Sequence, residues 1–173
     1  MSRTRNLLAG CLLALSAAAG LAIPAAASAS SSPAPALKLA TVKVMVNGKS
    51  EKQTLIVNSA GHAVYLLTGD SAKKPKCTSS TCLDNWPAVT TSSKKPVLGK
   101  GIKGKLAIWH HKGLNQLTLN GHPLYLFAAD TSAGIAGGQG LVSFGGTWEV
   151  LSASGAAAKL SDPSSSSGSG SGW

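Results

Sequence analysis

Apolar and polar residues alternate along the middle of the chain with the period of two that is typical of β-strands. Val42, Val44 and Val46 alternate with Thr, Lys and Met, and Leu117 and Leu119 repeat the pattern. Further strand-like segments lie at 53–58, 63–68, 105–110, 123–128 and 147–151. No part of this region shows a convincing helical period, so we expect antiparallel meanders of about seven strands.

Turn signals separate these segments. Asn47-Gly48 and Asn120-Gly121 are typical of two-residue hairpin turns, and Ser59-Ala60-Gly61 indicates another turn. Segments 63–68 and 123–128 carry bulky apolar side chains on both faces. We therefore expect these two segments to be the most buried strands.

One motif occurs twice in the chain. Segment 61–70 (GHAVYLLTGD) aligns without a gap to segment 121–130 (GHPLYLFAAD), at an offset of 60 residues. Each copy follows a strand and a turn, and each is followed after a loop by a tryptophan, Trp86 or Trp148. The sequence therefore predicts an all-β fold, a small antiparallel sandwich or barrel-like domain made of two pseudo-symmetric β-meander repeats.

Composition divides the chain into four parts. Arg3 and Arg5, an apolar run over 7–23 and small residues near 25–30 predict a secretion signal peptide over residues 1–29. Residues 30–40 are rich in Ser, Pro and Ala and 153–173 end in a Ser-Gly tract, so we expect a linker and a flexible tail. The β domain is then expected over 41–152, with repeat 1 at about 41–100 and repeat 2 at about 101–152.

The three cysteines suggest two different fates. Cys11 ends the tetrapeptide Leu-Ala-Gly-Cys, a possible signal for lipid attachment, although few residues precede it. Ordinary cleavage of the signal would remove Cys11 and leave Cys77 and Cys82, an even number in an oxidising compartment. We therefore expect a disulfide between Cys77 and Cys82 that fixes a local turn.

The paired Gly-His-x-[Val/Leu]-Tyr-Leu segments ending in Asp, the stretch from Cys77 through Cys82 to Trp86-Pro87, and Gly146-Thr147-Trp148 carry a resemblance. The chain resembles the bacterial secreted-repeat family of predicted lipoproteins that carry a paired Y-x4-D motif. The resemblance implies an exported or lipid-anchored protein with tandem repeats and no established activity.

The motif residues are Tyr65 and Asp70 in the first copy and Tyr125 and Asp130 in the second. A spacing of five places a tyrosine and its aspartate on opposite faces of an unbroken strand, so direct contact within one copy requires the chain to turn. We expect the aspartates to cap the turns that leave their strands by accepting backbone N–H bonds. A ligand-binding role for the aspartates is the alternative.

Three other kinds of site are considered. His62 and His122 are repeat equivalents and, with His110 and His111, suggest a metal or redox-cofactor protein, although no metal-binding spacing is present and we expect no cofactor. Trp86, Trp109 and Trp148 are expected in the core, with stacking on sugar rings as the alternative. A wall-polymer hydrolase is the weakest interpretation, because no acid–base pair or Gly-x-Ser-x-Gly motif is present and we expect no enzyme activity. The Gly-rich segment 134–140 lacks the Lys-Ser/Thr of a phosphate loop and is expected to be a mobile loop.

The charge balance indicates a partner. The chain has a formal net charge of +10, which falls to about +8 once residues 1–29 are removed. Export favours an anionic cell-wall polymer or membrane surface over nucleic acid as the counter-charge, and a purely solubilising role is the alternative. The candidate contacts are the lysines of three loop clusters: Lys73, Lys74, Lys76, Lys94, Lys95, Lys100, Lys103 and Lys105.

Overall fold

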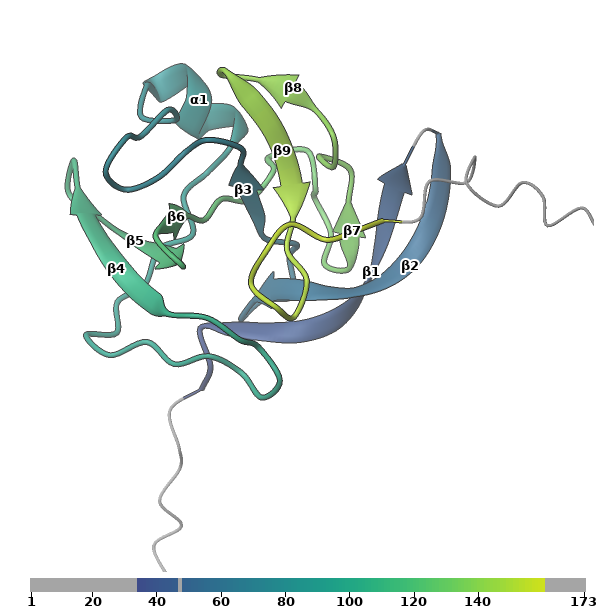
Figure 1. Ribbon diagram of the computed structural model, residues 1–173, viewed down its shortest axis with the longest axis horizontal. Coiled ribbons are helices and arrows are strands. Elements are labelled where there is room, and N and C mark those ends of the chain that lie inside the picture. The colour runs from purple at the N-terminus through teal and green to yellow at the C-terminus, as the bar shows by residue number, and fades with distance from the viewer. Residues whose placement is uncertain (1–33, 47, 161–173) are drawn as a thin grey trace, which may run out of the picture. The chain divides into compact units, whose positions relative to one another are not determined.

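The computed structural model describes residues 34–46 and 48–160, which all fall within one compact unit of the chain (Figure 1). Nearly all of its regular structure is β-strand. The elements in chain order are β1 (Leu37–Val46), β2 (Lys49–Asn58), β3 (Tyr65–Leu67), α1 (Ser80–Asn85), β4 (Leu106–His111), β5 (Leu114–Leu119), β6 (His122–Pro123), β7 (Ile135–Ala136), β8 (Val142–Ser143) and β9 (Gly146–Val150). The expected signal peptide, including Cys11, lies outside the described residues, as do 161–173 of the expected tail.

The first sheet is built on one long hairpin. β1 and β2 pair antiparallel over their full ten-residue lengths, and the short β7 adds to β1 in parallel. Val42 and Val44 are fully buried, whereas Lys43 between them is exposed, as the alternating sequence predicts. β1 begins at Leu37, so the fold starts earlier than the predicted boundary at 41.

The other two sheets have the strand orders β4-β5-β6 and β3-β9-β8. Two-residue turns join β4 to β5, β5 to β6 and β8 to β9. In the β5–β6 turn, Asn120 has φ 54° and Gly121 has φ 85°. A type I′ turn requires positive φ at both central positions, so the hairpin predicted from Asn120-Gly121 is confirmed.

Buried residues form two apolar clusters. One contains the aromatic side chains Tyr65, Trp86, Tyr125 and Trp148, and the other is mainly Leu, Ile and Val from β1, β2, β5 and the chain around Leu124. The all-β fold class is confirmed. The strands form three small sheets, and none of them closes into a barrel within the described residues. The pairing of two whole repeats by pseudo-symmetry stays a prediction.

The structure corrects the prediction for 123–128. The regular strand β6 ends at Pro123. Beyond it, Leu124 donates its N–H to Leu117, Tyr125 to Tyr65 and Leu126 to Pro87. Because successive backbone groups bond to three different segments, no continuous ladder forms. Leu124 and Tyr125 are fully buried, as predicted for this segment, but Ala128 is exposed.

Three further expectations also change. α1 is a helix where none was expected, and it begins after Ser79, whose side chain accepts the N–H of Cys82. The chain after 152 is not all spacer: Ala158 donates its N–H to the carbonyl of Val150 and packs on the aromatic cluster. The Gly-rich segment 134–140 contains β7, and its N–H groups bond within the core.

Candidate functional site

The Y-x4-D residues meet across the two copies of the motif. The Tyr65 hydroxyl donates to Oδ2 of Asp130 at 2.6 Å, and the Tyr125 hydroxyl donates to Oδ2 of Asp70 at 2.8 Å. The two tyrosines also pair by backbone, with the N–H of each bonded to the carbonyl of the other at 2.8 and 2.9 Å. Each aspartate therefore holds the tyrosine of the other copy, and we call this arrangement the crossed Tyr–Asp pairs.

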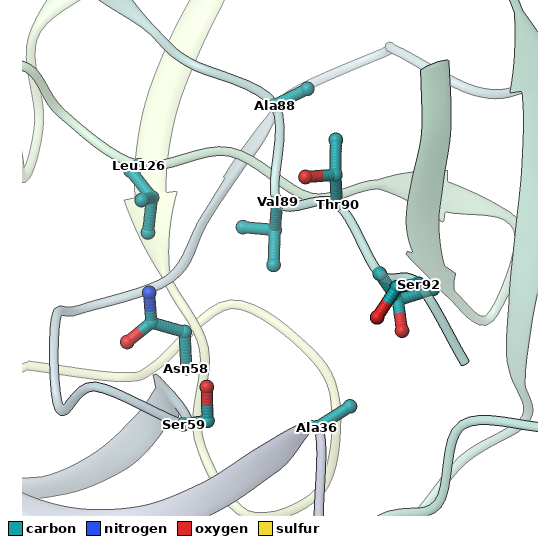
Figure 2. A pocket seen from close by; sticks show the side chains of 9 residues that line it. Ala36, Asn58, Ser59, Ala88, Val89, Thr90, Ser92 and Leu126 are labelled. Atoms are coloured by element: carbon teal, nitrogen blue, oxygen red, sulfur yellow. The ribbon is translucent and has the colours of Figure 1, made fainter.

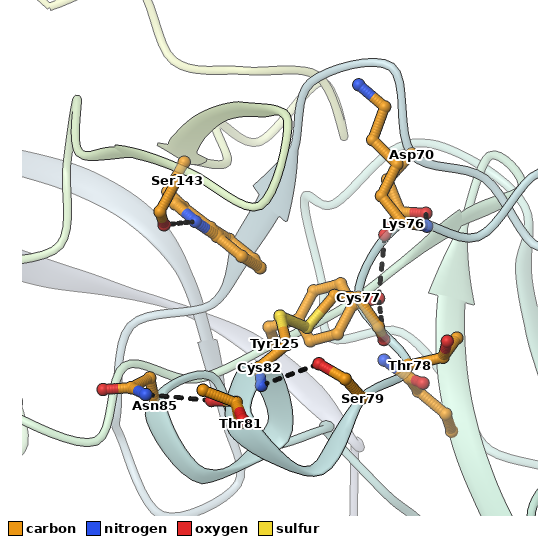
Figure 3. Close-up of a disulfide and its surroundings, with 12 residues drawn as sticks. Asp70, Lys76, Cys77, Thr78, Ser79, Thr81, Cys82, Asn85, Tyr125 and Ser143 are labelled. Atoms are coloured by element: carbon orange, nitrogen blue, oxygen red, sulfur yellow. Dashed lines mark hydrogen bonds between the residues drawn. A yellow bond between two sulfur atoms is a disulfide. The ribbon is translucent and has the colours of Figure 1, made fainter.

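The second oxygen of each carboxylate accepts a backbone N–H. Oδ1 of Asp70 accepts from Lys76, and Oδ1 of Asp130 accepts from Gly137, both at 2.8 Å. These bonds agree with the turn-capping role expected for the aspartates, although each donor lies six or seven residues further along the chain. Figure 3 shows the Tyr125–Asp70 bond beside the disulfide, where the same hydroxyl also lies 3.4 Å from the carbonyl oxygen of Cys77.

Burial holds both tyrosines in the protonated, donating form. Tyr65 and Tyr125 have no exposed surface. Burial raises the pKa of each hydroxyl well above its usual value of about 10, and the neighbouring Asp130 or Asp70 raises it further. A buried phenolate beside a carboxylate would be unfavourable, so the hydroxyls act as fixed hydrogen-bond donors.

The geometry of the crossed pairs fits a role in stabilising the fold. Asp70 is 1 % exposed and Asp130 is 7 % exposed, and both oxygens of each carboxylate already accept bonds from the protein. A general base or a ligand-binding carboxylate needs an oxygen that its substrate can reach. The four motif residues thus tie the two copies together within the core.

The two repeat-equivalent histidines also bond across the two copies of the motif. Nδ1 of His62 lies 3.2 Å from the carbonyl oxygen of Asp130, and Nδ1 of His122 lies 2.8 Å from that of Asp70. Since a carbonyl only accepts, Nδ1 carries the proton in both rings. His110 bonds Asn115 and His111 bonds Gln116. Within the described residues, no three His, Cys, Asp or Glu side chains gather closely enough to hold a metal ion.

The tryptophans differ in their surroundings. Trp86 is 2 % exposed, and its ring is stacked both on Trp148, at 3.8 Å between centroids, and on Phe127, at 4.5 Å. Trp148 is fully buried, so neither indole offers a free face to a sugar ring. Trp109 does not match the expectation of a core residue, because it is only half-buried and stacks on His111 at 3.6 Å.

Cys77 and Cys82 form the expected disulfide, with their Cα atoms 5.5 Å apart. Both cysteines are buried in the aromatic cluster, and Cys82 lies within α1 (Figure 3). The bond closes the loop that leads from Lys76, the backbone partner of Asp70, into the helix. The disulfide therefore fixes one of the two loops whose backbone N–H groups bond the aspartates of the crossed pairs.

A pocket of about 320 Å³ lies between the start of β1 and the segment after Trp86 (Figure 2). Its lining consists of small, hydroxyl, amide and aliphatic side chains, with no acid, base or cysteine among them: Ala36, Asn58, Ser59, Ala88, Val89, Thr90, Thr91, Ser92 and Leu126. Such a lining offers hydrogen bonds and hydroxyl groups, but no acid or base among its residues that could transfer a proton or activate a hydroxyl for nucleophilic attack.

The candidate lysines are all exposed, and their clusters lie in or beside loops as predicted from the sequence. Lys76 differs from the others, because its Nζ donates to the carbonyl oxygens of Thr68 and Gly145. Asn120 accepts the N–H of Lys105, which places that lysine beside the β5–β6 turn.

Sequence reasoning missed the partners of the motif. The crossing itself and the N–H groups of Gly137 and Gly138, which bond Asp130 and the Tyr65 hydroxyl, were not predicted. The odd Tyr-to-Asp spacing was the available signal. It disfavours contact within a copy, and two equal copies leave the aspartate of the other copy as the natural partner.

Comparison with known proteins identifies one part of the chain. Residues 96–152 match a family described as a secreted repeat of unknown function. The predicted resemblance to secreted repeats is thereby confirmed, over a segment that contains Tyr125 and Asp130. No curated protein and no solved structure matches the chain. In the part of the chain that the structure describes, no helix has the length and apolar character needed to cross a membrane.

Proposed function

We propose that this protein is an exported, non-catalytic module of the cell envelope that binds anionic envelope material through its exposed loop lysines. The match to a secreted repeat supports export. The observation that supports binding to anionic material is the uneven placement of charge: the candidate lysines lie on the surface, whereas two of the acidic side chains are buried in the core.

The surface is more basic than the composition alone suggests. Of the six acidic residues in the chain, Asp70 and Asp130 are buried and bonded within the core, so they contribute little to the outer field. The candidate lysines are exposed, and most stand near others in sequence. A net positive surface attracts polyanions through many weak contacts that add up.

The absence of catalysis in this proposal rests on the crossed pairs. The repeated tyrosines and aspartates are the natural candidates for an active site, but their hydroxyls and carboxylate oxygens bond one another and the backbone. A module whose repeated motif supports its fold can present its outer loops for binding. Incubation with isolated wall material should therefore give no turnover, and release of soluble fragments above a no-protein control would contradict this part of the proposal.

Co-sedimentation with isolated envelopes tests the binding. We expect the protein to sediment with envelopes at low salt and to be released at about 1 M salt without detergent, because the Debye length shrinks there to roughly 3 Å. Retention through the high-salt wash would contradict electrostatic binding. Release only by detergent would instead indicate lipid attachment at Cys11.

A matched pair of variants separates the clusters from net charge. The triple variant Lys100→Gln, Lys103→Gln, Lys105→Gln removes one candidate cluster. The control removes three exposed lysines of the β1–β2 hairpin that lie outside the clusters: Lys43→Gln, Lys49→Gln, Lys52→Gln. We expect the cluster variant to lose more envelope binding than the control. Equal losses would show that only total charge matters.

A further inference from the structure

A second pocket, of about 390 Å³, lies where the loop after Asp70 meets the β5–β6 turn. It is lined by Ser71, Ala72, Lys73, Asn120, Gly121 and His122. The N–H of Ala72 donates to the carbonyl of Gly121 at 3.1 Å and holds the loop against the turn. Two segments about 50 residues apart in sequence thus form one small hollow, with the polar groups of Ser71, Lys73, Asn120 and His122 among its lining residues.

The lining presents donors that the fold leaves available. Ser71 Oγ accepts the N–H of Lys74 at 3.1 Å, which leaves its hydroxyl hydrogen available to donate. Nδ1 of His122 donates to the Asp70 carbonyl, so Nε2 faces a ligand as an acceptor in the neutral ring and as a donor only when the ring carries both protons. The exposed Lys73 adds a positive charge.

The surroundings make the pocket more positive. Lys74 follows Lys73 in the same exposed loop, and Lys105 lies beside Asn120 through their backbone-to-side-chain bond at 2.9 Å. The nearest acid in sequence, Asp70, has both carboxylate oxygens bonded to Tyr125 and Lys76 in the core. The loop that carries Lys73 and Lys74 and the backbone of Lys105 therefore both lie beside this turn.

We propose that this pocket binds a phosphate group of the anionic envelope polymer, with Lys73, Ser71 and His122 as its contacts. This inference rests on the proposed function and names the ligand chemistry and site. An ammonium and a hydroxyl can donate to the oxygens of one phosphate, and the His122 ring can donate through Nε2 when it binds in its doubly protonated form, which keeps the Nδ1 bond. The Tyr125–Asp70 pair acts through His122 by fixing the carbonyl that orients its ring.

The other copy of the motif offers a natural control. His62 is held by the carbonyl of Asp130, and Gly134 donates its N–H to Gly61 at 3.1 Å, much as Ala72 does to Gly121. The matching loop reads Thr-Ser-Ala over 131–133 and has no lysine. The same backbone arrangement therefore lacks the charge, and we expect no phosphate binding beside His62.

An NMR titration of the secreted protein with inorganic phosphate, at ionic strength held constant with chloride, tests the site. Amide signals of 71–73 and 121–122 should shift and saturate at phosphate concentrations on the order of 1–10 mM. Lys73→Gln and His122→Gln should each weaken binding roughly fivefold to tenfold. His62→Gln and Lys94→Gln should leave the dissociation constant within about twofold.

Several results would overturn the site. Shifts that chloride alone reproduces, or that follow Lys94→Gln as strongly as Lys73→Gln, would show a diffuse charge effect. Envelope binding that persists unchanged in Lys73→Gln and His122→Gln would contradict the pocket while leaving the proposed function in place. Saturable phosphate binding at the pocket, without any sedimentation on envelopes, would support the site and contradict the proposed function.

Discussion

Alkaline pH should destabilise the protein through its two buried tyrosines. Tyr65 and Tyr125 are the only tyrosines in the chain, and burial raises the pKa of both above the usual 10. Above pH 10 the unfolded chain loses these protons while the native protein keeps them. The unfolded state then binds fewer protons, so the free energy of unfolding falls as pH rises.

The size of this effect follows from linkage. At pH 11 an unfolded tyrosine with a pKa of 10 has gained about 1.4 kcal/mol by ionising, and little of that gain exists at pH 9. Two tyrosines that stay protonated in the native state therefore predict a loss of about 2.7 kcal/mol between pH 9 and pH 11. Urea unfolding, followed by tryptophan fluorescence at several pH values, measures the loss.

Single variants isolate the contribution of each tyrosine. Tyr65→Phe removes one titrating group, so its stability should fall by about 1.4 kcal/mol less over the same pH range than that of the wild type. Tyrosinate absorbance in the wild type should appear only as the protein unfolds. If tyrosinate formed near pH 10 in protein that remained folded, the buried, donating hydroxyls described above would be wrong.

Two further predictions concern the packing around the crossed pairs. Replacing Cys77 and Cys82 together by Ala should lower the free energy of urea unfolding by about 2 kcal/mol, as the chain-entropy model gives for so short a loop. The intact mass of the wild type should rise by two hydrogens on reduction. Two free thiols in fresh protein would contradict the bond. Gly138→Ala would place a Cβ 2.7 Å from the stacked Trp86 ring and should lower the free energy of unfolding by about 1–3 kcal/mol. The control Gly140→Ala should cost less, because its Cβ meets no atom and only its φ of 76° is unfavourable. Equal unfolding midpoints for the two variants would contradict the close approach.

Local pattern predicted the parts of the fold that depend on local chemistry. The alternation around Val42 and Val44 predicts the inward face of β1. Asn120-Gly121 predicts the β5–β6 turn, because only a few residues accept positive φ there. The six-residue helix α1 is too short to show a period and depends on a cap at Ser79. Small residues after 152 resemble a spacer in composition, although their backbone bonds to the strand that precedes them.

The contacts of the candidate site could not be predicted from the sequence, for a different reason. Alignment of the two copies establishes that Tyr65 and Tyr125 are equivalent, and likewise Asp70 and Asp130. Equivalence does not specify which aspartate meets which tyrosine, because both pairings use the same residue types. The pocket beside His122 is hidden in the same way, since Lys73 and Asn120 become neighbours only through the fold.

A double-mutant cycle on the crossed pairs tests the central claim most directly. Tyr65→Phe and Asp130→Ala, alone and together, should show a coupling energy of about 1.5–3 kcal/mol in urea unfolding, as for a hydrogen bond to a charged group. The control cycle pairs Tyr65→Phe with Asp70→Ala, residues of the same copy, and should be additive within about 0.5 kcal/mol. Coupling confined to Tyr65 and Asp130 is the predicted result, and stronger coupling between Tyr65 and Asp70 would contradict the crossed arrangement.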